Sequence, residues 1–350
     1  MRSWPRTRPL PPPLTTPTTG DAGSAWDLGL RARSTVRWFT SRPPVSLWVG
    51  LGILVGFGGV AIASLILFRN AGTYLPQNAV WAASVYPPGP SWAHPFGILH
   101  GIVGIDLLQA MVRATPWDLA IVGAILLLAL SIGLLLGGIA GGSGSTTTDI
   151  VVTSWTDAIA GVPPFFLVFV VFLPIATLVP VSWSLPVFVL SFGFVLWPYH
   201  ARLVRAQARE VREEPFVESA RASGSGRWSI VRRHILPNSY RAVLTQVPAD
   251  VASIFFVLTV FPFAHCFDSD PRLGDYLFPL LTPLPNPGPS YPAPFFPEWG
   301  NLLAQGVCFG YQISWPSNQW WLYFFPLLTI VVFAVGVSLF CDGLLPQDQR

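Results

Sequence analysis

Long apolar runs separated by short polar segments dominate the sequence after residue 45. Each run holds roughly 20 residues with few charges, which is the length that a helix needs to cross the hydrocarbon core of a bilayer. Six runs fit this description: residues 46–68, 118–140, 151–178, 184–201, 242–263 and 320–341. The pattern predicts an all-α polytopic membrane protein with about six transmembrane helices.

A charged segment, residues 213–238, interrupts this pattern between the fourth and fifth runs. Pro215 follows two glutamates and suits the first position of a helix, where a missing N–H costs nothing and acidic groups face the positive end of the dipole. Gly224 is typical of a helix end. A second amphipathic stretch follows, which we expect Pro237 and Asn238 to end, and these two residues can open the next helix. The prediction is two short helices joined at a glycine and held at a membrane surface.

The composition agrees with a membrane protein and argues against two other classes. Of the 350 residues, 52% are hydrophobic and 11% are charged, which is too apolar for an ordinary soluble domain. The net charge of +3 rests on arginine alone, without an aromatic-interleaved basic groove, so no nucleic-acid partner is expected. Because the sequence has no lysine, its Gly-Ser stretch at 141–145 cannot be a Walker A loop. Any ATP chemistry must therefore lie on another chain.

Residues 1–45 contain seven arginines and eight prolines but few large apolar side chains, so they cannot bury a core. We predict that they form a disordered, basic cytosolic tail. A cleaved signal peptide is the alternative, but the first apolar run begins near residue 46 and has the length of a membrane span. Residues 46–345 would then form the transmembrane domain, and residues 346–350 a short C-terminal tail.

The arginines are distributed unevenly between the two sides of the predicted membrane. With the N-terminus inside, 17 of the 20 arginines lie in cytosolic segments, and only Arg69, Arg113 and Arg272 lie outside. Cytosolic segments of membrane proteins carry such an excess of basic residues. We therefore expect a cytosolic N-terminus and a cytosolic 213–238 segment.

Residues 264–319 hold ten prolines and are predicted to form an irregular outer loop. It would act either as a lid or docking surface or as a plain connection. Cys266 and Cys308 fall in this loop and would pair only in an oxidising compartment. Two unpaired thiols are the alternative.

Residues 213–238 resemble the EAA loop of the membrane subunits of ABC importers. The matching residues are Glu218, Ser219, Ala220, Gly224, His234, Leu236 and Pro237. The family pattern is Glu-Ala-Ala, a glycine four residues after the second alanine, and a Leu-Pro further on. The ending His-Ile-Leu-Pro-Asn is the form common in the oligopeptide, dipeptide and nickel branch. Ser219 stands in place of the middle alanine.

Other motifs occur in the order of the C-type permeases of that branch. Residues His94 to Gly97 resemble the segment ahead of the second span, and Gly137 to Gly142 resemble the family's glycine-rich turn. Glu298 to Leu303 resemble its closing region. The resemblance covers about residues 45–345.

The resemblance implies a type I ABC importer permease fold in the inner membrane, surrounded by lipid. The chain would pair with a second homologous permease, two ABC ATPase subunits and an extracytoplasmic solute-binding protein, and would import peptides or a related small solute. The matching residues of the EAA loop would form a coupling helix that moves with the ATPase. A solvated connector on anionic lipid is the alternative for this segment. Residues 98–105 and 261–267 depart from the family pattern, and both concern the outer side.

Asp157 and Asp250 lie inside apolar runs, and ionisable groups there are candidates for the translocation pathway. Helix packing or capping is the alternative role. No histidines and cysteines have a metal-site spacing, no catalytic cluster can be assembled, and no cofactor is expected. An ATP-independent secondary transporter or channel is the alternative function. It would predict inverted repeats and ionisable groups near the middle of the membrane.

Overall fold

The computed structural model describes residues 44–69, 89–99, 105–179, 183–265, 298–312 and 319–345. The predicted N-terminal tail before residue 44, most of the proline-rich loop and the tail after residue 345 lie outside these residues. Cys266 lies outside them as well, so the predicted pairing of Cys266 with Cys308 stays a prediction.

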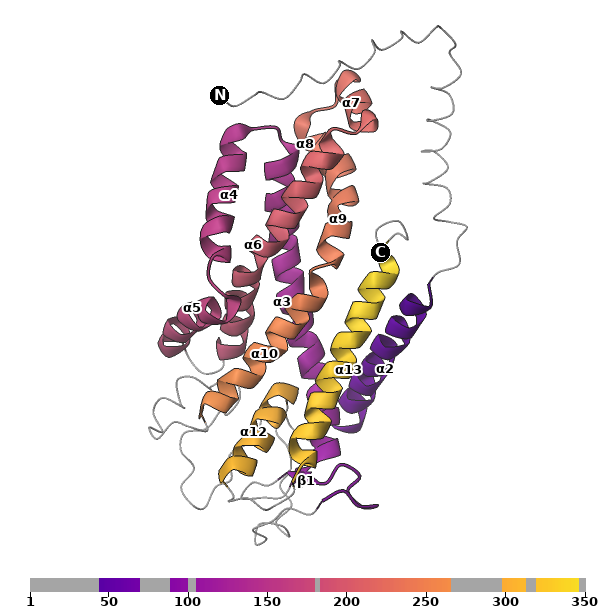
Figure 1. Ribbon diagram of the computed structural model, residues 1–350, viewed down its shortest axis with the longest axis vertical. Helices are drawn as coiled ribbons and strands as arrows, with labels where there is room; N and C mark the ends of the chain where they lie inside the picture. Colours follow the sequence, from indigo (N-terminus) through magenta and orange to yellow (C-terminus); the bar gives the residue numbers. More distant parts are fainter. Residues whose placement is uncertain are drawn as a thin grey trace, which may run out of the picture. The chain divides into compact units, whose positions relative to one another are not determined.

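Four helices of the described part are long and apolar enough to cross a membrane. They are α2 (Val45–Leu67), α3 (Leu107–Gly142), α6 (Ser184–Arg212) and α13 (Trp321–Leu344). They confirm the first, second, fourth and sixth predicted spans, and Figure 1 shows them running along the long axis of the molecule. Helix α3 begins before its apolar run because the Asp106 side chain caps it, accepting a hydrogen bond from the Gln109 amide at 2.9 Å.

The other two predicted spans are bent pairs of helices. Helix α4 (Thr146–Ala160) meets α5 (Pro164–Leu178) at 93°, and the segment Arg227–Leu244 meets α10 (Val247–His265) at 55°. The span predicted over 151–178 is therefore broken by a bend. Pro163 and Pro164 have no N–H to donate to the preceding turn, so the hydrogen-bond ladder ends with the Val162 amide, which donates to the Ile159 carbonyl at 3.3 Å.

The charged segment forms α7 (Pro215–Ala222), α8 (Arg227–Ile230), a π-helical turn (Val231–Ile235) and α9 (Leu236–Leu244). Pro215 and Gly224 bound the first helix as predicted. The prediction that Pro237 can open the next helix agrees with the structure, since this residue lies in the first turn of α9. The predicted end of the preceding helix there was wrong, because the π-helical turn joins α8 to α9 without a break. In the widened π-helical turn the Leu236 amide donates to the Val231 carbonyl five residues earlier. This turn makes room for the ring of Pro237 in a helix that continues.

Two smaller elements complete the described chain. The strands β1 (Ile98–Leu99) and β2 (Ile105–Asp106) form an antiparallel pair, and α12 (Trp299–Gln312) precedes α13. Trp299 is fully buried, and its indole N–H donates to the Met111 carbonyl of α3 at 3.2 Å. Its ring lies against Phe255 of α10 at a centroid distance of 5.7 Å and against Phe333 of α13 at 5.8 Å. This aromatic core joins the two halves of the helical bundle.

A row of glycines on α3 lets α6 approach to backbone contact. A Cβ atom added at Gly137 would lie 2.5 Å from the Ala201 carbonyl oxygen, and one at Gly133 or Gly141 would also collide with α6. Between helices in lipid there is little hydrophobic driving force, so close packing of small residues carries much of the association. The α3–α6 pair is thus fixed by residues four positions apart on one helix face.

We expect Gly137→Val to lower the free energy of unfolding by about 1–3 kcal/mol, because the added side chain must push α6 away. The measurement is unfolding of the purified protein in mixed detergent micelles. Gly123→Val on the same helix is the control, since a Cβ at Gly123 meets nothing within 4 Å. Equal losses for the two variants would contradict the packing described here.

Candidate functional site

Helix α7 stands at one end of the bundle and is held there by a small apolar cluster of its own (Figure 1). The cluster consists of Ala208 and Val211 from α6, Val217 from α7, Ile230 from α8, and Val231 and Ile235 from the π-helical turn. Val217 is fully buried, whereas Glu218 and Ser219 beside it are exposed. One face of α7 is thus anchored, and the opposite face is open.

The sequence sets the length of α7 through local interactions. Pro215 occupies its first turn, and the Ser219 hydroxyl donates to the Pro215 carbonyl at 2.9 Å. Gly224 follows with φ +83°, a left-handed conformation that glycine adopts without strain. The Ser225 amide then donates to the Ala220 carbonyl at 3.1 Å and closes the turn. The chain therefore reverses sharply after α7.

The residues that carry the EAA pattern divide into an outer and an inner set. Glu218, Ser219, Gly224 and Pro237 are exposed, and Ala220, His234 and Leu236 are half-buried. The ring of His234 in the π-helical turn lies 6.0 Å from the ring of Phe216 in α7, so the two rings bring these elements together. A Cβ at Gly138 of α3 would collide with Leu236. The inner set supports the segment, and the outer set is free for a partner.

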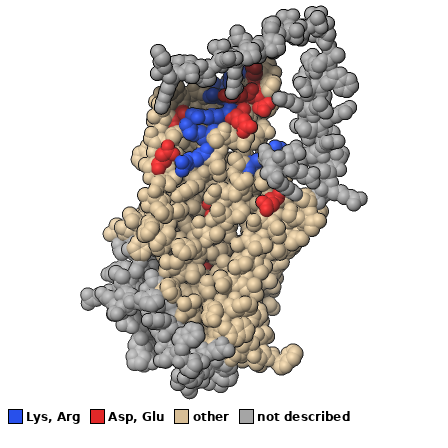
Figure 2. Space-filling model, viewed as in Figure 1, with Lys and Arg blue, Asp and Glu red and all other residues tan. Residues whose placement is uncertain are grey.

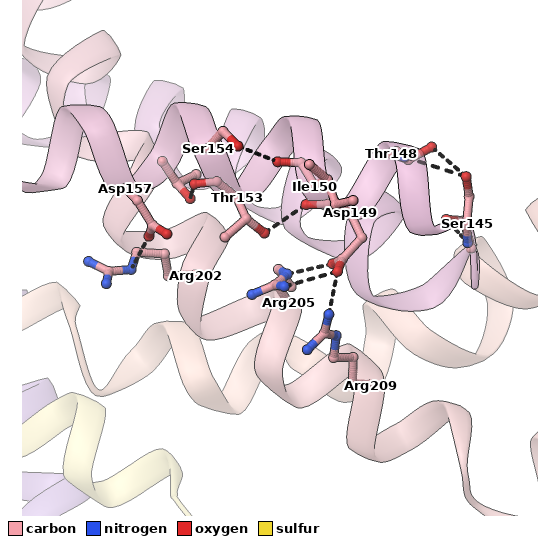
Figure 3. A network of polar contacts seen from close by, with 12 residues as sticks. Ser145, Thr148, Asp149, Ile150, Thr153, Ser154, Asp157, Arg202, Arg205 and Arg209 are labelled. Carbon is pink, nitrogen blue, oxygen red and sulfur yellow. Dashed lines mark hydrogen bonds and ion pairs between the residues drawn. The ribbon is translucent and has the colours of Figure 1, made fainter.

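An arginine–carboxylate network ties α4 to α6 near the same end (Figure 3). Asp149 accepts two hydrogen bonds from Arg205, from Nε at 2.6 Å and from Nη2 at 3.0 Å, and a further one from Arg209. Asp157 faces Arg202 at 3.5 Å, and both side chains are about half exposed. Figure 2 shows that blue and red residues gather at this end of the molecule.

The arginines of this network were not singled out from the sequence. A signal was present, because Arg202, Arg205 and Arg209 recur at helical spacing on the polar end of an otherwise apolar helix. Asp149, the partner of Arg205 and Arg209, lies 56 residues before Arg205 in the chain, so only the packing of α4 on α6 brings them together.

Asp250 lies in the interior of the protein. Its side chain is 1% exposed, and its Oδ2 lies 2.7 Å from Nε2 of His200, which is fully buried on α6. The Gln246 amide donates to the other carboxylate oxygen at 3.2 Å. A further buried pair, in which both members are acidic, brings Asp118 of α3 against Glu298 at the start of α12. No pattern in the sequence indicated that His200 would meet Asp250.

In the described residues, no group of three or more histidine, cysteine, aspartate and glutamate side chains could hold a metal ion. The pairs of Asp149 with Arg205 and Arg209 join α4 to α6, as Figure 3 shows.

Comparison with known proteins points to one family. Residues 133–264 match the family model described as the inner membrane component of binding-protein-dependent transport systems. A probable D,D-dipeptide transport system permease protein of Escherichia coli K12 is 28% identical over 272 residues, which is 78% of each chain. These matches support a permease of the binding-protein-dependent ABC importers. The matched range of the permease runs from the α3 glycine row through the charged segment to α10.

Two further relatives of the permease agree with this assignment. A candidate peptide permease of Brucella ovis is 27% identical over 259 residues, covering 73% of this chain and 72% of the relative. A candidate peptide transport system permease of Brucella suis is 30% identical over 147 residues, covering 42% and 40%.

The family fixes the general role of the permease. It is a multi-pass component of the inner membrane that works with ATPase and solute-binding partners, and it is not itself an enzyme. ATP hydrolysis lies on the partner subunits, in agreement with the absence of lysine from this chain.

We expect Asp149→Asn to loosen α4 from α6 and to lower the free energy of unfolding by about 1–3 kcal/mol, because charge-assisted hydrogen bonds to two arginines are lost. The measurement is denaturant unfolding at low and high salt. Asp157→Asn is the control, since its single exposed contact should contribute little. An Asp157→Asn loss as large as that of Asp149→Asn would contradict the central place given to Asp149.

Proposed function

We propose that this permease imports peptides or a related small solute. The relatives that align with over 70% of the chain are named as dipeptide and peptide permeases, which supports this substrate class. In the proposed complex it pairs with a second homologous permease, and the two permeases work with two ATPase subunits and a solute-binding protein. Such a pair would enclose the path between its spans.

The exposed face of α7 is the proposed docking site for the ATPase. The observation that carries the proposal is the arrangement of one short helix whose Val217 is fully buried while Glu218 and Ser219 project outward. Small and polar side chains allow close approach of a partner surface, and the apolar cluster below resists tilting of the helix. A push on α7 is therefore delivered to α6 and α9 instead of being absorbed by a loose loop.

The proposed cycle follows from this attachment. Nucleotide binding brings the two ATPase subunits together, and the coupling helices move with them. The spans then change between inward-open and outward-open arrangements, because the two states differ in their contacts with the ATPase. A role of Asp157 and Asp250 in the solute pathway stays a prediction.

The proposed orientation has the N-terminus in the cytosol. The arginine asymmetry supports this orientation. Gly343 near the end of α13 lies against Leu47 near the start of α2. The two ends of the transmembrane domain thus share one side. This arrangement agrees with an even number of membrane crossings.

We expect Gly224→Val to reduce ATP-driven peptide uptake strongly while the protein still inserts into the membrane. Valine at φ +83° is strained by about 1–2 kcal/mol, and this strain would displace α7 from its anchored position. Uptake of a labelled alanine dipeptide into vesicles that contain the full complex is the measurement. Gly226→Val is the control, because Gly226 has φ −65° and open space around it. Normal uptake by Gly224→Val would favour the plain connector.

Docking itself is tested by a cysteine at Ser219, which is exposed at the centre of the proposed surface. We expect Ser219→Cys to form cross-links with an ATPase subunit when the partner genes are co-expressed. A cysteine at the exposed Ala252 of α10, away from α7, is the control. Purification of the tagged permease without any ATPase, and no cross-link from position 219, would overturn the docking proposal.

A further inference from the structure

Helices α6 and α10, on either side of the charged segment in the chain, meet inside the protein through a buried polar contact. Nε2 of His200 on α6 lies 2.7 Å from Oδ2 of Asp250 on α10, and the two side chains are 0% and 1% exposed. The whole charged segment, residues 213–238, lies between these two residues in the chain. The contact thus joins the two helices between which the segment with α7 lies in the chain.

Each partner of this contact stands beside a weak point of its own helix. Pro198 lies two residues before His200 and removes a backbone donor from the middle of α6. Asp250 follows the 55° bend between Leu244 and Val247, and Gln246 in that bend binds Asp250 through its side chain. The contact therefore connects the two places where α6 and the α9–α10 segment can flex most easily.

The surroundings hold His200 in one place. A Cβ at Gly133 of α3 would collide with the Cβ of His200, so the α3 backbone lies directly behind the imidazole side chain. Burial of a polar pair in an apolar bundle is costly, and replacing one partner alone leaves the other without compensation. The pair is thus a specific polar contact between the two helices, defined by the 2.7 Å approach of its nitrogen and oxygen atoms.

We propose that His200 and Asp250 are positioning residues that make α6 and α10 move as one body when the ATPase displaces α7. Without the link, a push on α7 bends α6 at Pro198 or widens the α9–α10 bend, and the motion does not reach the spans. This inference rests on the proposed docking of α7. It assigns Asp250 to the transmission of motion between helices.

The test uses the full importer complex in proteoliposomes and compares ATP hydrolysis with uptake of a labelled alanine dipeptide. We expect His200→Phe and Asp250→Asn to keep ATP hydrolysis while dipeptide uptake per ATP falls about tenfold or more. The exchange variant, His200→Asp with Asp250→His, should restore most of the ratio. Ser253→Ala is the control, because the Ser253 hydroxyl only bonds the Ala249 carbonyl of its own helix. A proportional loss of hydrolysis, uptake and protein amount would show a structural role alone and overturn the proposal.

A second measurement does not depend on the solute. Spin labels on cysteines placed at the exposed residues Ala206 of α6 and Ala252 of α10 report the distance between the two helices, after the native cysteines are replaced by serine. We expect this distance to stay constant between the nucleotide-free and vanadate-trapped complexes, and to change on trapping in Asp250→Asn. A change in the unmodified pair would overturn the proposal. If these distances behave as expected and the dipeptide is not taken up, the peptide assignment fails and the mechanical link stands.

Discussion

The close contact between α3 and α6 is the constraint on which the rest of this structure depends. Glycines at positions 133, 137 and 141 of α3 leave no room for any side chain beneath α6, so the two backbones lie in contact over about two turns. In lipid, large apolar side chains pack against acyl chains about as well as against another helix, so they contribute little to association. Close packing of small residues supplies the van der Waals contact that holds the two helices together. Since α6 leads directly into the charged segment, this contact decides where α7 stands.

Helix α3 also supports the part of the charged segment that follows α7. Gly138 and Gly142, on the neighbouring face of α3, lie under Leu236, Ile235 and Val231. Helix α6, which leads into the charged segment, and the turn and helix that follow α7 therefore both pack on α3, and the apolar cluster around Val217 lies between them. The exposed face of α7 is held in a fixed position because the helices beneath α7 pack against the backbone of α3.

Polar contacts set the register of helices that the apolar surfaces alone would leave free to slide. The Asp149 network aligns α4 with α6, and the His200–Asp250 pair aligns α6 with α10. Each such pair has few equivalent positions, because a buried or partly buried polar group must keep its partner. The bundle thus combines uniform glycine packing with a small number of specific links, which suits a protein that must move without losing its arrangement.

The sequence by itself determined the membrane spans, the boundaries of α7 at Pro215 and Gly224, and the resemblance that named the family. These features are local, since span length, proline at a helix start and glycine at a helix end depend on neighbouring residues only. The bend between α4 and α5 and the π-helical turn ahead of Pro237 lie at prolines that the sequence marks, but the 93° angle and the unbroken passage into α9 were visible only in the structure. The partners of Asp149 and Asp250 were decided by the tertiary structure alone. These contacts join segments far apart in the chain, and a single sequence carries no record of which distant side chains will meet.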